Sequence, residues 1–161
     1  ESYSLAKLKS LNPNIFNCCD KHRMYIEIIQ NTNKDIKEGA VFNETGIIGQ
    51  VVNNKSFYEV MLLTDTKSSI PLTNSKGDFY CNASGSGASD YITCSYSQLV
   101  WLDNHELGEK FFSSGLGGIY PKGIEIGNLE SIKIVDTSTT LLTIKLISNP
   151  LHSNLFGVMK L

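Results

Sequence analysis

Short runs of strand-favouring residues, separated by closely spaced turn signals, extend from about residue 23 to the end of the chain. The first run, residues 24–29, is rich in β-branched and aromatic side chains. Further runs lie at 47–52, 57–63, 78–82, 91–96, 99–102, 110–113, 124–135 and 140–148. Turn-forming residues separate them at 53–54, 74–77, 85–87, 103–104 and 136–138. Parallel strands need long crossover connections, so these spacers exclude a parallel α/β sheet and predict an all-β barrel or sandwich.

The first residues follow a different pattern. Leu5, Leu8 and Leu11 recur at helical spacing, and Asn12-Pro13 ends the pattern. A short helix with one apolar stripe is not stable alone. We therefore predict that residues 1–22 contain the end of a longer coiled-coil helix and a linker.

An internal repeat links two distant segments. Residues 39–49 align without a gap on residues 108–118, and both read Gly-x-x-Phe-x-x-(Thr/Ser)-Gly-apolar-x-Gly. A glycine at such a corner takes backbone angles that other residues avoid, so that one strand ends and the next leaves in a new direction. The repeat predicts two related β units.

The overall composition excludes several classes of protein. Hydrophobic residues make up 41% of the chain and charged residues 19%, as in ordinary globular domains. The net charge is -2 and no basic stripe exists, so no nucleic-acid partner is expected. No apolar run approaches the length of a membrane span. The chain begins with Glu1 instead of Met, and we interpret it as a fragment of a longer protein.

The cysteines leave one question open. Cys18 and Cys19 form no CxxC pair and have no histidine at a zinc-ligand spacing, so no metal site is expected. Cys81 and Cys94 flank the turn-rich residues 82–89 and can face each other across a hairpin. They are either two half-buried thiols or a cross-strand disulfide, which needs an oxidising compartment.

A serine hydrolase is the alternative function that the residues allow. Ser86 lies between two glycines, and His22 with Asp20, or His105 with Asp103, would supply a base. Both histidines lie in polar stretches, and Gly-Ser-Gly is ordinary hairpin chemistry. The leading interpretation is therefore a binding module without catalytic residues.

The glycine-rich run at residues 115–118 does not predict a phosphate or cofactor site. A phosphate cradle needs glycines that lead into a helix. Here Pro121 and Gly123 predict another turn, and Lys122 does not stand at the P-loop position. No cofactor is expected.

Residues 111–127 resemble the most characteristic stretch of the MreC family of rod shape-determining proteins. That family carries a hydrophobic strand followed by Thr-Ser-Gly-Leu-Gly-Gly-hydrophobic-Phe-Pro-x-Gly and a strand with another glycine. Here Ser113 replaces the usual Thr and Tyr120 the usual Phe. Residues 46–52 and 60–65 are also similar to family elements. The matching motif residues are Gly46, Gly49, Ser114, Gly115, Leu116, Gly117, Gly118, Pro121, Gly123 and Gly127.

The resemblance covers roughly residues 23–130 and has departures. The family's Lys-Gly-x-x-Asp-Gly loop is not recognisable in residues 31–35, and residues 76–98 differ from the common pattern. We expect a surface particular to this lineage there.

The resemblance implies two small six-stranded β-barrels, with a chymotrypsin-like topology but no catalytic triad, after a coiled-coil helix. We expect the first barrel over residues 23–72 and the second over 73–149. The C-terminal residues 150–161 form a strand that the first barrel can recruit, but the sequence does not decide which of the two barrels contains it. It also implies a short cytoplasmic tail, one inner-membrane helix and a coiled coil before or at Glu1, which would make this chain the periplasmic region.

The resemblance further implies a non-enzymatic scaffold of the cell-elongation machinery. Such a scaffold self-associates as a dimer or filament, and it binds and activates the elongation-specific class B penicillin-binding transpeptidase. Other membrane proteins of the machinery would bind the missing N-terminal part.

Apolar contacts are expected to carry the partner interaction. Aromatic residues beside turns are the best candidates, and these are Phe57, Tyr58 and Tyr120. Period-two alternation places Phe57 and Tyr58 on opposite faces, and we expect Tyr58 to point outward.

Overall fold

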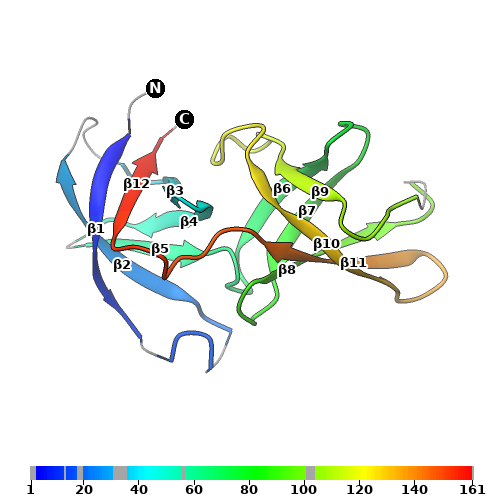
Figure 1. The fold of residues 1–161 in the computed structure, drawn as a ribbon, viewed down its shortest axis with the longest axis horizontal. Helices are drawn as coiled ribbons and strands as arrows, with labels where there is room; N and C mark the ends of the chain where they lie inside the picture. The colour runs from blue at the N-terminus through cyan, green and yellow to red at the C-terminus, as the bar shows by residue number, and fades with distance from the viewer. Residues whose placement is uncertain are drawn as a thin grey trace.

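The computed structural model describes residues 3–12, 14–17, 20–30, 36–55, 57–100 and 104–160, which form twelve β-strands and no helix. The strands make two closed antiparallel barrels of six strands each, lying side by side (Figure 1). The first barrel contains β1 (Ser4–Leu11), β2 (Arg23–Gln30), β3 (Gly39–Asn43), β4 (Gly46–Asn53), β5 (Tyr58–Leu62) and β12 (Leu155–Met159). The second contains β6 (Ser69–Asn74), β7 (Tyr80–Gly85), β8 (Tyr91–Ser97), β9 (Lys110–Ser113), β10 (Glu125–Ile134) and β11 (Thr139–Leu146). In the described part of the chain, no helix is long or apolar enough to cross a membrane.

The two barrels share one strand arrangement. The order β12-β3-β4-β5-β2-β1 in the first barrel corresponds to β6-β9-β10-β11-β8-β7 in the second. The C-terminal strand β12 thus closes the first barrel, in the place that β6 occupies in the second. The first copy of the glycine repeat covers β3 and the start of β4, and the second covers β9 and the first part of the loop that follows it; β3 and β9 occupy equivalent positions. This equivalence agrees with the interpretation of two related β units.

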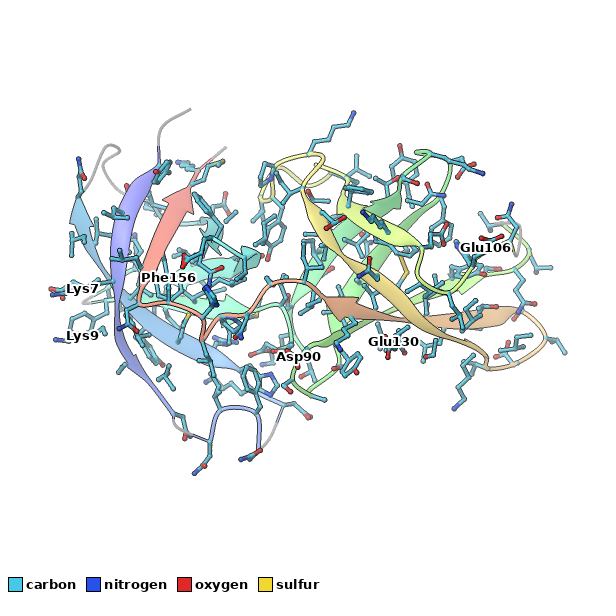
Figure 2. The ribbon with its side chains drawn as sticks, viewed as in Figure 1. Lys7, Lys9, Asp90, Glu106, Glu130 and Phe156 are labelled. Atoms are coloured by element: carbon cyan, nitrogen blue, oxygen red, sulfur yellow. A yellow bond between two sulfur atoms is a disulfide. The ribbon has the colours of Figure 1, made fainter. Side chains whose placement is uncertain are left out.

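Alternating side chains fill each barrel. In β8, Ile92 and Cys94 are fully buried, while Thr93 between them faces outward. In the first barrel, Phe156 of β12 lies in the interior, and Lys7 and Lys9 point away from β1 into solvent (Figure 2). Closing both sheets pairs every edge strand, so neither barrel offers a free edge to another chain.

The prediction of an N-terminal helix is wrong, because residues 4–11 form strand β1 of the first barrel. A register shift between Leu8 and Ser10 adds one residue to the strand. Leu8 and Leu11, three residues apart, therefore both pack against the core of the first barrel. A β-bulge produced the spacing that suggests a helix.

The expected boundary between the barrels also needs correction. The sequence places residues up to 72 in the first barrel, but β6 (Ser69–Asn74) pairs with β7 and β9 in the second. The division falls in the linker of residues 63–68. The strand expected at 99–102 is not formed at Leu99 and Val100, which lie in a turn; the rest of that segment lies outside the described residues.

Asp65 fixes the linker to the first barrel. Its Oδ2 atom accepts hydrogen bonds from the backbone nitrogen of His22 and from Nε of Arg23, both at 2.9 Å. Its Oδ1 atom accepts one from the backbone nitrogen of Lys67, also at 2.9 Å. Arg23 forms a second ion pair with Glu59.

These contacts determine the charge of Asp65, whose side chain is 1% exposed. Burial disfavours a carboxylate, but hydrogen bonds from Lys67, Arg23 and His22 outweigh burial and lower the pKa of Asp65 below its usual value. The second barrel packs on the same linker, since a Cβ atom at Gly85 of β7 would lie 1.9 Å from the carbonyl oxygen of Asp65.

A disulfide joins Cys81 of β7 to Cys94 of β8, with Cα atoms 6.2 Å apart. The alternative of two free thiols is therefore wrong. The β7–β8 ladder includes only the residues from Ala83 to Gly85 on β7. The disulfide therefore holds the first half of β7 against β8, where no ladder pairs are formed.

We predict that replacing Cys81 and Cys94 together by serine lowers the free energy of unfolding by about 3 kcal/mol, because the bridge closes a short loop in the unfolded chain. Chemical denaturation measures this change. Reductant should lower the melting temperature of the parent protein and leave that of the double variant unchanged. Equal stability of the oxidised parent and the variant would contradict the prediction.

We also predict that Asp65→Asn lowers the free energy of unfolding at neutral pH by about 3 kcal/mol, because Arg23 loses a buried partner. The folded-state pKa of Asp65 lies below its unfolded value of about 3.9, so its stabilisation is present above that pH. It is lost as the pH falls through the folded-state pKa, and the difference between parent and variant should narrow there. The matched control is Asp136→Asn in the exposed β10–β11 turn, which should be nearly as stable as the parent at neutral pH.

Candidate functional site

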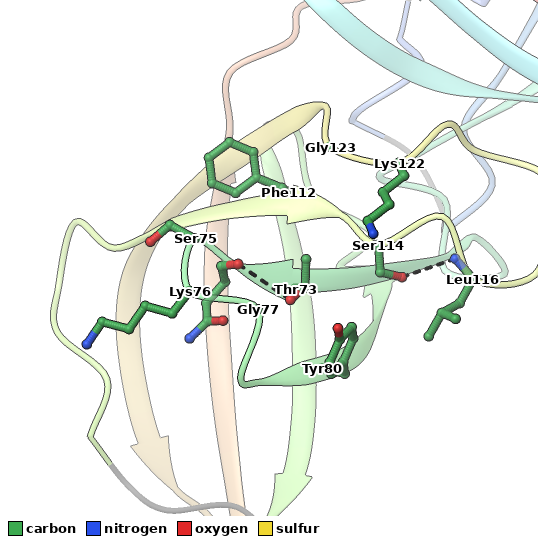
Figure 3. A pocket seen from close by; sticks show the side chains of 11 residues that line it. Thr73, Ser75, Lys76, Gly77, Tyr80, Phe112, Ser114, Leu116, Lys122 and Gly123 are labelled. Carbon is green, nitrogen blue, oxygen red and sulfur yellow. Dashed lines mark hydrogen bonds between the residues drawn. The ribbon is translucent and has the colours of Figure 1, made fainter.

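An open groove of about 560 Å³ lies on the outer face of the second barrel (Figure 3). A row of three side chains from adjacent strands crosses the groove: Tyr80 of β7, Thr73 of β6 and Phe112 of β9, with the small Thr73 as the floor between the two rings. The strand register sets this row, because Thr73 pairs with Tyr80 on one side and with Phe112 on the other. Tyr80 is 42% exposed. Two aromatic side chains therefore flank a small residue on a rigid sheet.

Strand alternation decides which aromatic residue reaches the groove. Phe111 points into the barrel and is fully buried, so its neighbour Phe112 points outward. In β7, Tyr80 faces outward, while the next residue, Cys81, packs against the core. The disulfide thus lies directly behind the groove wall that carries Tyr80.

The β9–β10 loop, residues 114–124, forms the other wall. It contributes Ser114, Leu116, Lys122 and Gly123 to the groove, and Leu116 is 59% exposed. The Ser114 hydroxyl accepts a hydrogen bond from the backbone nitrogen of Leu116 at 3.3 Å (Figure 3). Part of the glycine-rich motif therefore forms one wall of an exposed surface.

Ser113 closes the base of this loop. Its hydroxyl donates to the carbonyl oxygen of Pro121 and accepts from the backbone nitrogen of Ile124 at 3.0 Å. Its carbonyl oxygen accepts from the backbone nitrogen of Gly123 at 2.8 Å. A serine thus makes the closing contacts at the position where the family pattern has threonine.

Gly115 is required by the turn of the loop. Its φ is +80°, a conformation that side chains rarely adopt. A Cβ atom there would also lie 2.8 Å from Cβ of Lys122 across the loop. The glycine therefore lets the two sides of the loop approach each other.

The groove is basic although the chain is acidic overall. Among the residues that the structure describes, Lys76, in the β6–β7 turn, and Lys122 are the charged residues that line it, and no Asp or Glu lines it. The net charge of the whole chain is -2. The groove is therefore positively charged, although the net charge of the chain is negative.

Tyr120 is not a partner-binding residue, contrary to the expectation. Its side chain is 1% exposed and lies in the core of the second barrel. Burial raises the pKa of its phenol, so Tyr120 is neutral at physiological pH. A ring inside the barrel cannot contact another protein.

Phe57 and Tyr58 have the opposite orientations to those expected. Phe57 is 40% exposed, and the ammonium group of Lys9 lies 5.1 Å from the centre of its ring. Tyr58 is half-buried and packs against the core of the first barrel. The alternation between the two residues is as predicted, but Phe57 is the exposed one.

The hydrolase alternative has no support in the geometry. The Ser86 hydroxyl donates to the carbonyl oxygen of Tyr91 at 2.6 Å, which closes the β7–β8 turn. The Nδ1 atom of His22 bonds Thr64 at 2.7 Å, and that of His105 bonds Glu109 at 2.8 Å. Among the described residues, no hydrogen bond joins Ser86 to either histidine.

The MreC family model, described as the barrel core of rod shape-determining protein MreC, matches residues 15–159. This chain belongs to the MreC family. MreC proteins are structural and not enzymatic, which removes the hydrolase alternative. The cell shape-determining protein MreC of Haemophilus influenzae is 32% identical over 112 residues, which cover 66% of this chain and 31% of that protein.

Solved MreC structures share the two-barrel fold. MreC from Pseudomonas aeruginosa has a TM-score of 0.79 at 21% identity, over 99% of both chains. The major periplasmic domain of the cell shape-determining filament MreC has a TM-score of 0.73 at 18% identity, over 98% of this chain and 94% of that one. MreC from Helicobacter pylori, in a complex with the penicillin-binding protein PBP2, has a TM-score of 0.71 at 15% identity, over 98% and 96%.

Sequence reasoning missed Tyr80 and Phe112 as candidate site residues of this chain. The usable signal was alternation within predicted strands 78–82 and 110–113, which gives each strand an outward aromatic residue. Their meeting depends on β6 lying between β7 and β9. The sequence pattern gave no strand at β6, so it provided no reason to bring them together.

We predict that Gly115→Ala lowers the free energy of unfolding by about 1–3 kcal/mol, because alanine is strained at this φ and meets Lys122. Gly117→Ala is the matched control: its φ is +82°, but no atom lies within 4 Å of the added Cβ. Gly117→Ala should therefore lower the free energy of unfolding less than Gly115→Ala does. Thermal unfolding measures both variants, and equal losses would show that the contact with Lys122 contributes nothing.

Proposed function

We propose that this chain is the periplasmic scaffold module of the cell-elongation machinery and that it binds the elongation-specific class B penicillin-binding transpeptidase. The Helicobacter pylori MreC relative forms a complex with PBP2, which supports a partner of this class. By this proposal the module activates the transpeptidase by binding it, and so maintains rod shape.

The observation that carries the proposal is the exposed apolar groove of Tyr80, Phe112 and Leu116. Both barrels are closed, so a partner cannot add a strand to an open edge. Binding must use side chains on the outer faces or loops. Aromatic side chains on a rigid sheet lose little entropy on binding and are typical interface hot spots.

Phe57 stays a second candidate contact, on the first barrel. Its ring is exposed beside the turn before β5. Tyr58 contributes less exposed surface, because its ring packs on the core. A contact at Phe57 would extend the interface to both barrels.

We infer a periplasmic location, anchored by an inner-membrane helix that precedes this chain in the full protein. The Cys81–Cys94 disulfide supports this inference, since such bridges persist in oxidising compartments. A relative with this fold is itself described as a periplasmic domain. We further propose that other membrane proteins of the machinery bind that preceding part.

We also propose that the chain self-associates as a dimer or filament. A relative with this fold belongs to a protein described as a filament. Exposed aliphatic residues at the end of β10 and directly after it, namely Ile132, Ile134 and Val135, offer surface for such contacts.

We predict that Tyr80→Ala and Leu116→Ala each weaken binding to the purified periplasmic region of the transpeptidase by about 30-fold in Kd, equivalent to about 2 kcal/mol. Surface plasmon resonance measures the affinity, and melting temperatures check folding. The control Leu151→Ala removes a similarly exposed leucine between β11 and β12 and should bind normally.

Phe57→Ala, measured in the same experiment, tests whether the first barrel contributes to binding. A large loss there, with none at Tyr80 or Leu116, would move the contact away from the groove. Absence of binding by the parent protein would reject the transpeptidase as partner.

A further inference from the structure

We propose that the groove on the second barrel recognises an extended acidic segment of its partner, in which an apolar side chain is flanked by carboxylates. The inference rests on the proposed function only for the identity of the partner. The chemistry of the segment follows from the groove itself.

The middle of the groove fits one apolar side chain. Tyr80 and Phe112 stand on strands that flank β6, and adjacent strands are about 4.8 Å apart, so the two rings bracket a space about 10 Å wide. Thr73 forms its low floor and Leu116 one of its walls. A single aliphatic or aromatic side chain fills such a space.

The two ends of the groove are open. Gly77 lies in the β6–β7 turn and Gly123 in the β9–β10 loop, and both line the groove. No atom lies within 4 Å of the Cβ position at either glycine. An extended main chain can therefore pass over each end and continue beyond the groove, which a closed small-molecule pocket would not allow.

The positive charges of Lys76 and Lys122 favour the binding of carboxylates. Figure 3 shows Lys76 and Lys122 on opposite sides of Thr73, with the Lys122 side chain directed toward Ser114 and the Lys76 side chain extending away from Thr73 and Tyr80. Within the described residues, neither ammonium group forms an ion pair. The nearby Glu125 is already paired with Lys110 at 3.4 Å. Both lysines are therefore available to carboxylates of a partner.

Charge reversal tests this assignment. Lys76→Glu and Lys122→Glu should each weaken binding to the purified transpeptidase region roughly fivefold, mainly through slower association, and the loss should shrink at high ionic strength. Lys76→Arg and Lys122→Arg should keep most of the affinity, because they keep the charge. Lys133→Glu, an exposed change on β10 of the same barrel, makes the same change in net charge and should have little effect.

Carbodiimide cross-linking identifies the partner groups directly. It joins an amine to a carboxylate without a spacer, so Lys76 and Lys122 should be coupled to Asp or Glu of the transpeptidase, as read by mass spectrometry. The inference is overturned if the parent protein binds but neither reversal weakens binding, if Lys133→Glu weakens it equally, or if no cross-link from either lysine forms in the complex. Failure of the parent protein to bind at all would instead reject the proposed function.

Discussion

The carboxylate of Asp65 is the contact on which the arrangement of the two barrels depends. It accepts hydrogen bonds from the start of β2 and from its own linker, and it pairs with Arg23. The second barrel packs on the same linker through Gly85, where a side chain would meet the carbonyl oxygen of Asp65. One buried charged group thus holds the linker against the first barrel at the point where the second barrel packs on it.

Closure of the barrels determines where recognition can occur. A closed sheet has no unpaired edge, so only outward side chains and loops remain for binding. The glycine-rich β9–β10 loop provides such a surface. Gly115 allows the turn of the loop, and the side chain of Leu116 is exposed on it. Across the strands from that loop, the disulfide supports Tyr80, because Cys81 is the next residue on β7. The groove is thus built from rigid parts on both sides.

The sequence was sufficient to predict an all-β fold, because alternating strand residues and short spacers are local signals. The sequence wrongly predicts a helix where β1 forms, because a bulge gives Leu8 and Leu11 a helix-like spacing. It also failed at Tyr120, because the motif predicts a turn but not whether the ring points into the core. The groove depends on Tyr80 and Phe112 meeting across β6, a contact between strands distant in sequence that no local pattern encodes.

The central claim is that the outer groove of the second barrel contacts the transpeptidase. Hydrogen–deuterium exchange of the chain, alone and in the complex, tests this claim most directly because it maps the contact without substitutions. We expect protection in the peptides that cover residues 73–80 and 112–123, and unchanged exchange in β1 and β12 of the first barrel. Protection confined to the first barrel, with the groove peptides exchanging as in the free protein, would contradict it.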